Sequence, residues 1–189
     1  MTDMIEQIIA AVAKKAANKA VVNIAIDGRC ASGKSTLAQA LHERLGGNLI
    51  HMDDFFLPIH MRTAERLSEA GGNVHYERFE EEVLKGLASG AVFEYGVYDC
   101  STDAVERRIE VQPAAVNIVE GTYSTAPRFG SPYDITVFVT TDAATQERRI
   151  RERNGDAGWQ MFRDRWIPLE ERYFEQFKEV QCADFTINT

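Results

Sequence analysis

The sequence predicts an α/β fold in which helices cover both faces of a mostly parallel central sheet. Two observations support this prediction. Short apolar runs rich in β-branched residues recur along the chain and alternate with segments of helical periodicity. The first run, residues 21–26, leads through a glycine-bounded turn into a helical pattern over residues 34–45. Since the 189 residues contain no linker and no internal repeat, we expect residues 1–189 to form a single domain.

The composition is that of a globular protein, with 44% hydrophobic and 26% charged residues and no apolar stretch long enough to cross a membrane. Glu6 interrupts the apolar N-terminal positions, unlike a secretory signal. The cysteines (Cys30, Cys100 and Cys182) lack metal-ligand spacing, so we expect a reduced, cytoplasmic setting. A net charge of -8 argues against nucleic acid as a partner, but not against ATP, which needs only a local positive site.

A packing helix is predicted over residues 2–19, because Ile5, Ile8, Ile9 and Val12 recur at helical spacing. Lysines follow near its C-terminal end, where the helix dipole favours positive charge. No residue in this segment suggests chemistry.

The turn after the first predicted strand has the spacing G-x-x-x-x-G-K-S from Gly28 to Ser35, which is typical of phosphate-binding P-loops. Glycines permit a close approach of the backbone to phosphate. Lys34 can reach the β- and γ-phosphates, and the Ser35 hydroxyl can ligate Mg²⁺. So short a pattern also arises by chance, but the flanking strand and helix favour a three-layer P-loop NTPase fold. The expected nucleotide-binding residues are Gly28, Arg29, Cys30, Ala31, Ser32, Gly33, Lys34, Ser35 and Thr36.

The next predicted strand starts at Asn48 and ends in two carboxylates, Asp53 and Asp54. Ligands of open parallel sheets bind beyond the carboxyl ends of the strands. Both carboxylates would therefore lie near substrate if this strand lies beside the first. An acid pair at a strand end can instead cap a helix. Because successive side chains of a strand point to opposite sides, the two are not expected to share one role.

The middle of the chain alternates helical and extended patterns. A helical segment is expected within residues 58–70 and another over residues 77–87, separated by a break at Gly71-Gly72-Asn73. Alternating patterns within residues 92–111 predict a β-hairpin or flap.

Two further strands are predicted over residues 115–120 and 134–140. The first ends in Glu120, a carboxylate placed like the acidic element that holds Mg²⁺ in P-loop proteins, although a purely structural role stays open. A helical segment over residues 159–177, interrupted near Pro168, and a last strand over residues 184–187 complete the chain.

A helix is predicted from about residue 142 to 153, where four arginines cluster before Gly155. Arg149 and Arg153 are four residues apart and share a face. A solvated helix with ion pairs accounts for some of these arginines. A guanidinium cluster before a glycine hinge also suits a phosphoryl-transfer lid, which we expect over about residues 148–160.

These residues together resemble the uridine kinase and phosphoribulokinase group of P-loop kinases, with bacterial uridine kinase-like proteins as the nearest match. The resemblance extends over nearly the whole chain after residue 20. Its most specific element is the Asp-x-Phe-aromatic stretch from Asp53 to Phe56, and the other matching segments are Gly71–Asn73, Tyr98–Asp99, Val119–Gly121 and Trp166–Leu169.

The resemblance implies an ATP- and Mg²⁺-dependent kinase in which Asp53 is the general base toward the acceptor hydroxyl. Lys34, Arg149 and Arg153 would balance the charge on the phosphates, and Ser35 and Glu120 would serve the magnesium ion. The residues implied to bind the acceptor are Asp53, Phe56, His75, Tyr76 and Tyr98.

Two positions depart from the uridine kinase pattern. His75 stands where the group carries the Asp that binds the ribose hydroxyls, and the stretch from Cys100 to Asp103 lacks the His that reads the pyrimidine. The expected acceptor is a small hydroxylated metabolite, with a nucleoside (uridine or cytidine) first and pantothenate, a sugar phosphate or another alcohol as alternatives. The sequence lacks the guanine-reading Asn-Lys-x-Asp motif, which disfavours a GTPase. It does not distinguish ATP from GTP as the phosphate donor. A non-catalytic ATP-binding regulator and a homo-oligomeric assembly stay open.

Overall fold

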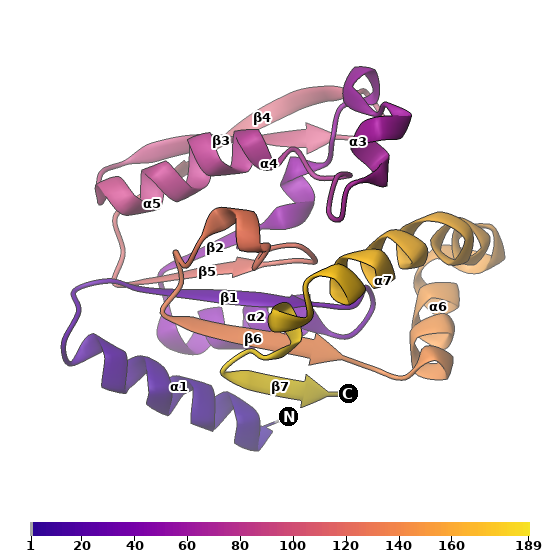
Figure 1. The fold of residues 1–189 in the computed structure, drawn as a ribbon. Coiled ribbons are helices and arrows are strands. Elements are labelled where there is room, and N and C mark those ends of the chain that lie inside the picture. Colours follow the sequence, from indigo (N-terminus) through magenta and orange to yellow (C-terminus); the bar gives the residue numbers. More distant parts are fainter. Residues whose placement is uncertain (1) are drawn as a thin grey trace.

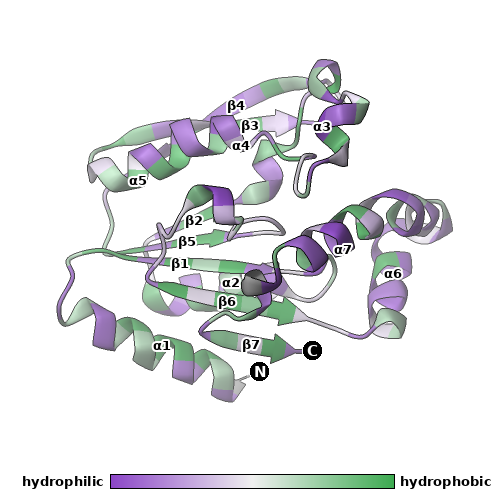
Figure 2. Ribbon diagram, in the orientation of Figure 1, coloured by the Kyte–Doolittle hydropathy of each residue, from purple (hydrophilic) through white to green (hydrophobic). Residues whose placement is uncertain are grey.

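The computed structural model describes residues 2–189, and its centre is a five-stranded parallel sheet with the strand order β2-β5-β1-β6-β7 (Figure 1). Figure 2 shows that hydrophobic residues concentrate in these strands. The predicted α/β fold is therefore confirmed. The strands are β1 (Val22–Gly28), β2 (Asn48–His51), β5 (Val116–Glu120), β6 (Ile135–Thr140) and β7 (Phe185–Asn188).

Helices cover both faces of the sheet, as predicted. On one face, α1 (Thr2–Ala16) and α2 (Lys34–Leu45) share a core with alternate residues of the strands, among them Ile24 and Ile26 of β1. On the other face, α7 (Ile167–Gln176) inserts Tyr173 and Phe174 into a second core. The period-two alternation of the strands thus divides their side chains between two apolar layers.

A smaller layer lies beyond the β2 edge of the sheet (Figure 1). It contains the antiparallel hairpin of β3 (Phe93–Asp99) and β4 (Ala104–Val111), which pairs as the alternating pattern predicted. Its helical part comprises the short α3 (Ala64–Ser68) and a continuous segment made of α4 (Tyr76–Phe79), a π-helical turn (Glu80–Leu84) and α5 (Lys85–Ser89). Phe55, Phe79 and Tyr95 join this layer to the second core.

The helix α6 (Ala143–Met161) carries the predicted arginines and is interrupted at Gly155, whose φ of 69° and ψ of -178° are not helical. A π-helical turn (Phe162–Trp166) then leads into α7, in whose first turn Pro168 lies. Because the helical backbone continues from Phe162 into α7, Pro168 removes one backbone donor within this segment, directly after the π-helical turn. No helix among residues 2–189 is both long enough and apolar enough to cross a membrane.

The strand before Asp53 does not lie beside the first strand, so the condition set for the two carboxylates after it is not met as stated. β5 pairs in parallel with β1 on one side and with β2 on the other, so it separates them. The pattern of each strand by itself does not specify its neighbours, because all these runs are similarly apolar. The order places Glu120, at the end of β5, between the ends of β1 and β2.

A row of asparagines crosses the three strands at the opposite end of the sheet. The side chain of Asn48 on β2 donates to that of Asn117 on β5 at 2.7 Å, and Asn117 donates to Asn23 on β1 at 2.9 Å. The same three residues are register partners in the sheet. Since buried polar groups that lose their partners are costly, this row favours one register of the strands.

Candidate active site

The main cavity, of about 510 Å³, opens at the carboxyl ends of the strands. This is where ligands bind in open parallel sheets. The loop between β1 and α2, the ends of β2 and β5, and the segment from α6 to α7 all line it. The predicted residues along its wall are Cys30, Ala31, Ser32, Gly33, Lys34, Ser35, Thr36, Asp53, Phe56, Glu120, Arg149 and Arg153.

The backbone of the loop after β1 has conformations that few side chains allow. Gly28 and Gly33 have φ values of 137° and 98°. A Cβ atom on Gly28 would lie 1.9 Å from the carbonyl oxygen of Val139 on β6, so only glycine fits there. Ala31 also adopts a positive φ, of 56°. This conformation lets the loop fold back over the N-terminus of α2.

The loop has the donors that a polyanion needs. α2 starts after Gly33 without a side-chain cap, so its first amides face the cavity unopposed by a carboxylate or hydroxyl. The Ser32 hydroxyl is buried without a hydrogen-bond partner. The Lys34 ammonium donates to the carbonyl oxygens of Gly28 (3.0 Å) and Arg29 (2.8 Å), which holds its charge beside the loop. The chemistry of the loop therefore fits a phosphate chain.

Strand alternation turns Glu120 toward α2, where both of its carboxylate oxygens lie 3.3 Å from the Ser35 hydroxyl. His51, on the same face of β2, contacts Glu120 through Nδ1 at 2.6 Å, and this hydrogen bond raises the pKa of His51. A carboxylate and a hydroxyl are ligands that Mg²⁺ accepts, with phosphate oxygens and water completing its shell. Within residues 2–189 no cluster of three or more Asp, Glu, His or Cys could hold a metal ion alone.

The two adjacent carboxylates after β2 have different surroundings. Asp53 lines the cavity and is exposed to it. Desolvation by the surrounding protein raises the pKa of Asp53, while the nearby Lys34 opposes the rise. Asp54 is not part of the cavity wall; it lies beside Tyr95, and its backbone carbonyl accepts a hydrogen bond from Arg78 at 2.6 Å.

The arginines of α6 divide into two pairs. Arg148 and Arg151 form i,i+4 ion pairs with Glu152 and Glu147 on the exposed side of the helix, as expected for a solvated surface. Arg149 and Arg153 line the cavity instead. Arg149 donates to the carbonyl oxygen of Ala31 at 3.1 Å, so its guanidinium already contacts the phosphate-binding loop.

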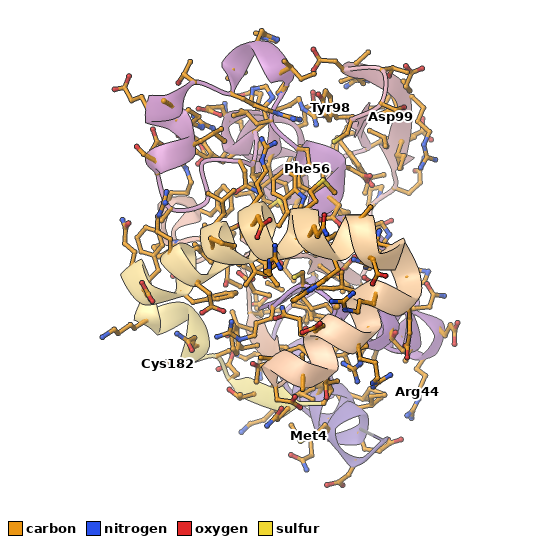
Figure 3. All side chains as sticks on the ribbon, turned by 90° about the vertical axis from the view of Figure 1, so that its right-hand side faces the viewer. Met4, Arg44, Phe56, Tyr98, Asp99 and Cys182 are labelled. Carbon is orange, nitrogen blue, oxygen red and sulfur yellow. The ribbon has the colours of Figure 1, made fainter. Side chains whose placement is uncertain are left out.

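Five predicted residues do not line the cavity: Gly28, Arg29, His75, Tyr76 and Tyr98. Gly28 and Arg29 lie at the start of the phosphate-binding loop but do not line the cavity. Tyr76 donates to Glu69 at 2.8 Å and packs against Arg66 and Arg128. Tyr98 bonds to Asp103 within the hairpin, and in Figure 3 it lies farther than Phe56 from the long helical segment. The amide of His75 donates to the carbonyl oxygen of Phe55 at 2.7 Å.

Asp27, a carboxylate that is only 1% exposed, was not among the predicted site residues. It accepts hydrogen bonds from the amides of Gly28, Tyr123 and Thr125 and from the hydroxyls of Thr125 and Tyr173. Burial raises the pKa of Asp27, and these hydrogen bonds oppose the rise. Asp27 thereby connects β1, the loop after β5 and α7. The signal in the sequence is an acid inside an otherwise apolar strand.

Nine further residues of the cavity wall were not predicted as site residues, among them Asn73, Tyr123, Trp166 and Glu170. Trp166 and Glu170 are four residues apart in a helical segment and so share a face, a spacing that the sequence does display. Tyr123 has a positive φ of 78°, which no sequence pattern indicates.

No protein-family model matches the chain. A uridine kinase of Clostridium perfringens is 28% identical over 148 residues, which cover 72% of this chain and 70% of that protein. A possible uridine kinase of Bacillus stearothermophilus superimposes with a TM-score of 0.72 and 21% identity over 98% of both chains.

A second solved structure, YFH7 of Saccharomyces cerevisiae, is described as a candidate P-loop kinase with a circular permutation. It superimposes with a TM-score of 0.65 and 10% identity over 100% of this chain and 98% of that one. The predicted resemblance is thus confirmed: the chain is similar to uridine kinases in sequence and has the fold of P-loop kinases.

Proposed function

We propose that the protein is an ATP- and Mg²⁺-dependent kinase that phosphorylates a hydroxyl group of a small molecule. One observation carries this proposal. Asp53, the phosphate-binding loop and the Ser35–Glu120 pair line the same cavity. A phosphoryl-transfer site needs a proton acceptor, an anion cradle and a magnesium site within reach of one another.

Each residue has a distinct task in this mechanism. The α2 amides and Lys34 hold the β- and γ-phosphates, and Ser35 and Glu120 hold Mg²⁺, which neutralises phosphate charge when bound. Asp53 accepts the proton of the acceptor hydroxyl as its oxygen attacks phosphorus. Arg149 and Arg153 offset the negative charge that develops on the transferred group.

The uridine kinase relatives make a nucleoside the leading acceptor. His75 and the hairpin residues Cys100 to Asp103 still depart from the uridine kinase pattern, and His75 and Tyr98 lie outside the cavity wall. Pantothenate, a sugar phosphate or another alcohol is therefore kept as an alternative acceptor. A regulator that only binds ATP is disfavoured, because such a protein has no use for a carboxylate at the position of Asp53.

The test of this proposal is Asp53→Asn. The substitution keeps the size of the side chain but removes the proton acceptor, so we expect phosphate transfer to fall by about a hundredfold or more while ATP affinity stays nearly intact. Transfer is measured as acceptor-dependent ADP formation, and affinity by calorimetry with ATP and Mg²⁺.

Asp54→Asn is the matched control, because Asp54 is the adjacent carboxylate and is not part of the cavity wall. We expect this control to keep most of the activity. An equal loss of ATP affinity in Asp53→Asn would assign that carboxylate to magnesium rather than to proton transfer.

A further inference from the structure

Thr189, the residue that follows β7, contacts two parts of the candidate site. Its hydroxyl donates a hydrogen bond to the carbonyl oxygen of Ser32 in the phosphate-binding loop at 2.8 Å. The same hydroxyl accepts a hydrogen bond from Nη1 of Arg149, also at 2.8 Å. Thr189 does not line the main cavity itself, so any effect on the site acts through these two partners.

The backbone of Thr189 is fixed to the end of β6. Its amide donates to the carbonyl oxygen of Thr140 at 3.0 Å, and its carbonyl oxygen accepts a hydrogen bond from the Thr141 hydroxyl at 2.7 Å. β6 and β7 are parallel, and Figure 1 shows both ending at the edge of the sheet where β6 leads into α6. Because the backbone is bonded on both sides of the side chain, the hydroxyl is a fixed acceptor for Arg149.

Arg149 is held at one of its two terminal nitrogens. Nη1 donates to the carbonyl oxygen of Ala31 at 3.1 Å as well as to Thr189, and these two bonds use both hydrogens of that nitrogen. The donors on Nε and Nη2 are left for a ligand in the cavity, which Arg149 lines. Since the guanidinium is planar, two acceptors at one nitrogen also set the direction of the remaining donors, as recognition of an anion by two parallel N–H groups requires.

The phosphate-binding loop does not depend on Thr189 alone. Gln146, one helical turn before Arg149, donates to the carbonyl oxygen of Cys30 at 3.0 Å, and Glu170 accepts a hydrogen bond from the Cys30 amide at 3.0 Å. Both side chains are buried. We therefore expect the loop to keep its shape without the Thr189 hydroxyl, whereas Arg149 would lose one of its two acceptors.

We propose that Thr189 is a positioning residue for Arg149, whose guanidinium it holds in the orientation in which the free donors meet the terminal phosphate of the bound nucleotide. This inference rests on the proposed function, which assigns Arg149 to the charge of the transferred group. Thr189 acts through Arg149 and contacts neither the nucleotide nor the acceptor.

Thr189→Val tests this role, because valine has nearly the shape of threonine but no hydroxyl. Affinities for ADP and for a non-hydrolysable ATP analogue are measured by calorimetry with Mg²⁺, so this readout does not depend on turnover. We expect the preference for the analogue over ADP to fall by about fivefold while the ADP affinity stays within about twofold. In the kinase assay kcat should fall by about tenfold.

Three further variants separate positioning from a general structural role. Thr189→Ser keeps the hydroxyl and should restore the analogue preference of the parent. Thr186→Val, the same change at an exposed position of β7, should leave this preference unchanged. Arg149→Ala removes the group through which Thr189 acts, so adding Thr189→Val to it should cause no further loss.

Three outcomes would overturn the inference. An unchanged analogue preference in Thr189→Val, or equal losses of ADP and analogue affinity, would show that the hydroxyl does not act on the terminal phosphate. A further loss in the Arg149→Ala background would show that Thr189 acts through another group. A Thr189→Ser variant as impaired as Thr189→Val would show that the hydroxyl is not the part that matters.

Failure of the kinase function would be seen separately. If the parent binds both nucleotides but phosphorylates no acceptor, the proposed function is refuted. The two affinities would still decide whether Thr189 orients Arg149 toward the terminal phosphate.

Discussion

Asp53 has a protonation equilibrium that should appear in the kinetics. Desolvation by the surrounding protein raises the pKa of Asp53 above its ordinary value of 3.8, against the opposing effect of Lys34. A general base acts only when ionised, so activity is present above this raised pKa and is lost as the pH falls through it. We expect the acid limb of kcat/KM for the acceptor to have an apparent pKa above 3.8.

The measurement is a pH–rate profile at saturating ATP and Mg²⁺. The residual activity of Asp53→Asn should lack the same acid limb, because the titrating group is gone. A limb that persists unchanged in the variant would belong to another residue, and the role of Asp53 as the base would have to be given up.

At the residue scale, the sequence predicts the chemistry of the phosphate end better than that of the rest of the cavity wall. Lys34 and Ser35 come together because a strand, a turn and a helix fix their positions locally, and Glu120 joins them through the pairing of β5 with β1. Asn73 and Glu170 come together through contacts between segments about a hundred residues apart in the chain, which no local spacing encodes.

At the scale of elements, the contact between β1 and β6 depends on Gly28. Gly28→Ala would place a Cβ atom 1.9 Å from the Val139 carbonyl oxygen at a φ of 137°. Overpacking and backbone strain each cost about 1–3 kcal/mol, so we expect a loss of about 2–5 kcal/mol in the free energy of unfolding, measured by urea denaturation.

Gly130→Ala provides the comparison, because Gly130 also has a positive φ, of 68°, but has open space around its Cβ position. Its expected loss is only the backbone strain, about 1 kcal/mol. Equal losses at the two positions would show that the close approach of β1 to β6 is not what requires glycine.

The bounds of an element agree with the prediction where residues at both of its ends indicate where it begins and stops. The predicted helix over residues 34–45 begins and ends as α2 does, between Gly33 and Gly46. The strand order cannot be predicted in the same way, because the strands are similarly apolar and their sequences do not specify which of them pair. The π-helical turns at Glu80–Leu84 and Phe162–Trp166 are likewise invisible to a periodicity analysis, since each adds one residue to an otherwise regular helix.

At the scale of the whole molecule, Asp27 connects the sheet to the helical segment on its second face. Asp27→Asn replaces one acceptor oxygen with a donor. If the amide takes the place of Oδ2, the hydroxyls of Thr125 and Tyr173 can accept from it, but the Thr125 amide loses its acceptor. We expect the free energy of unfolding to fall by about 1–3 kcal/mol, measured by urea denaturation, which is the cost of one unsatisfied buried group.

Asp142→Asn is the control for this substitution. Asp142 caps α6 by accepting from the Thr145 amide at 2.9 Å, and asparagine is an equally good cap. The control should therefore unfold at nearly the same urea concentration as the parent. A similar stability for both variants would mean that Asp27 does not hold the layers together.

The row of Asn23, Asn117 and Asn48 has a consequence for the Ser35–Glu120 pair at the far end of the same strands. Asn117 and Glu120 lie on one strand, so the register that the three amides favour also fixes the position of the carboxylate. A slip of β5 by one position would point Glu120 away from Ser35 and remove the carboxylate from the proposed metal site. Transfer of this pocket to another α/β scaffold would therefore require the three asparagines as well, although none of them lines the cavity.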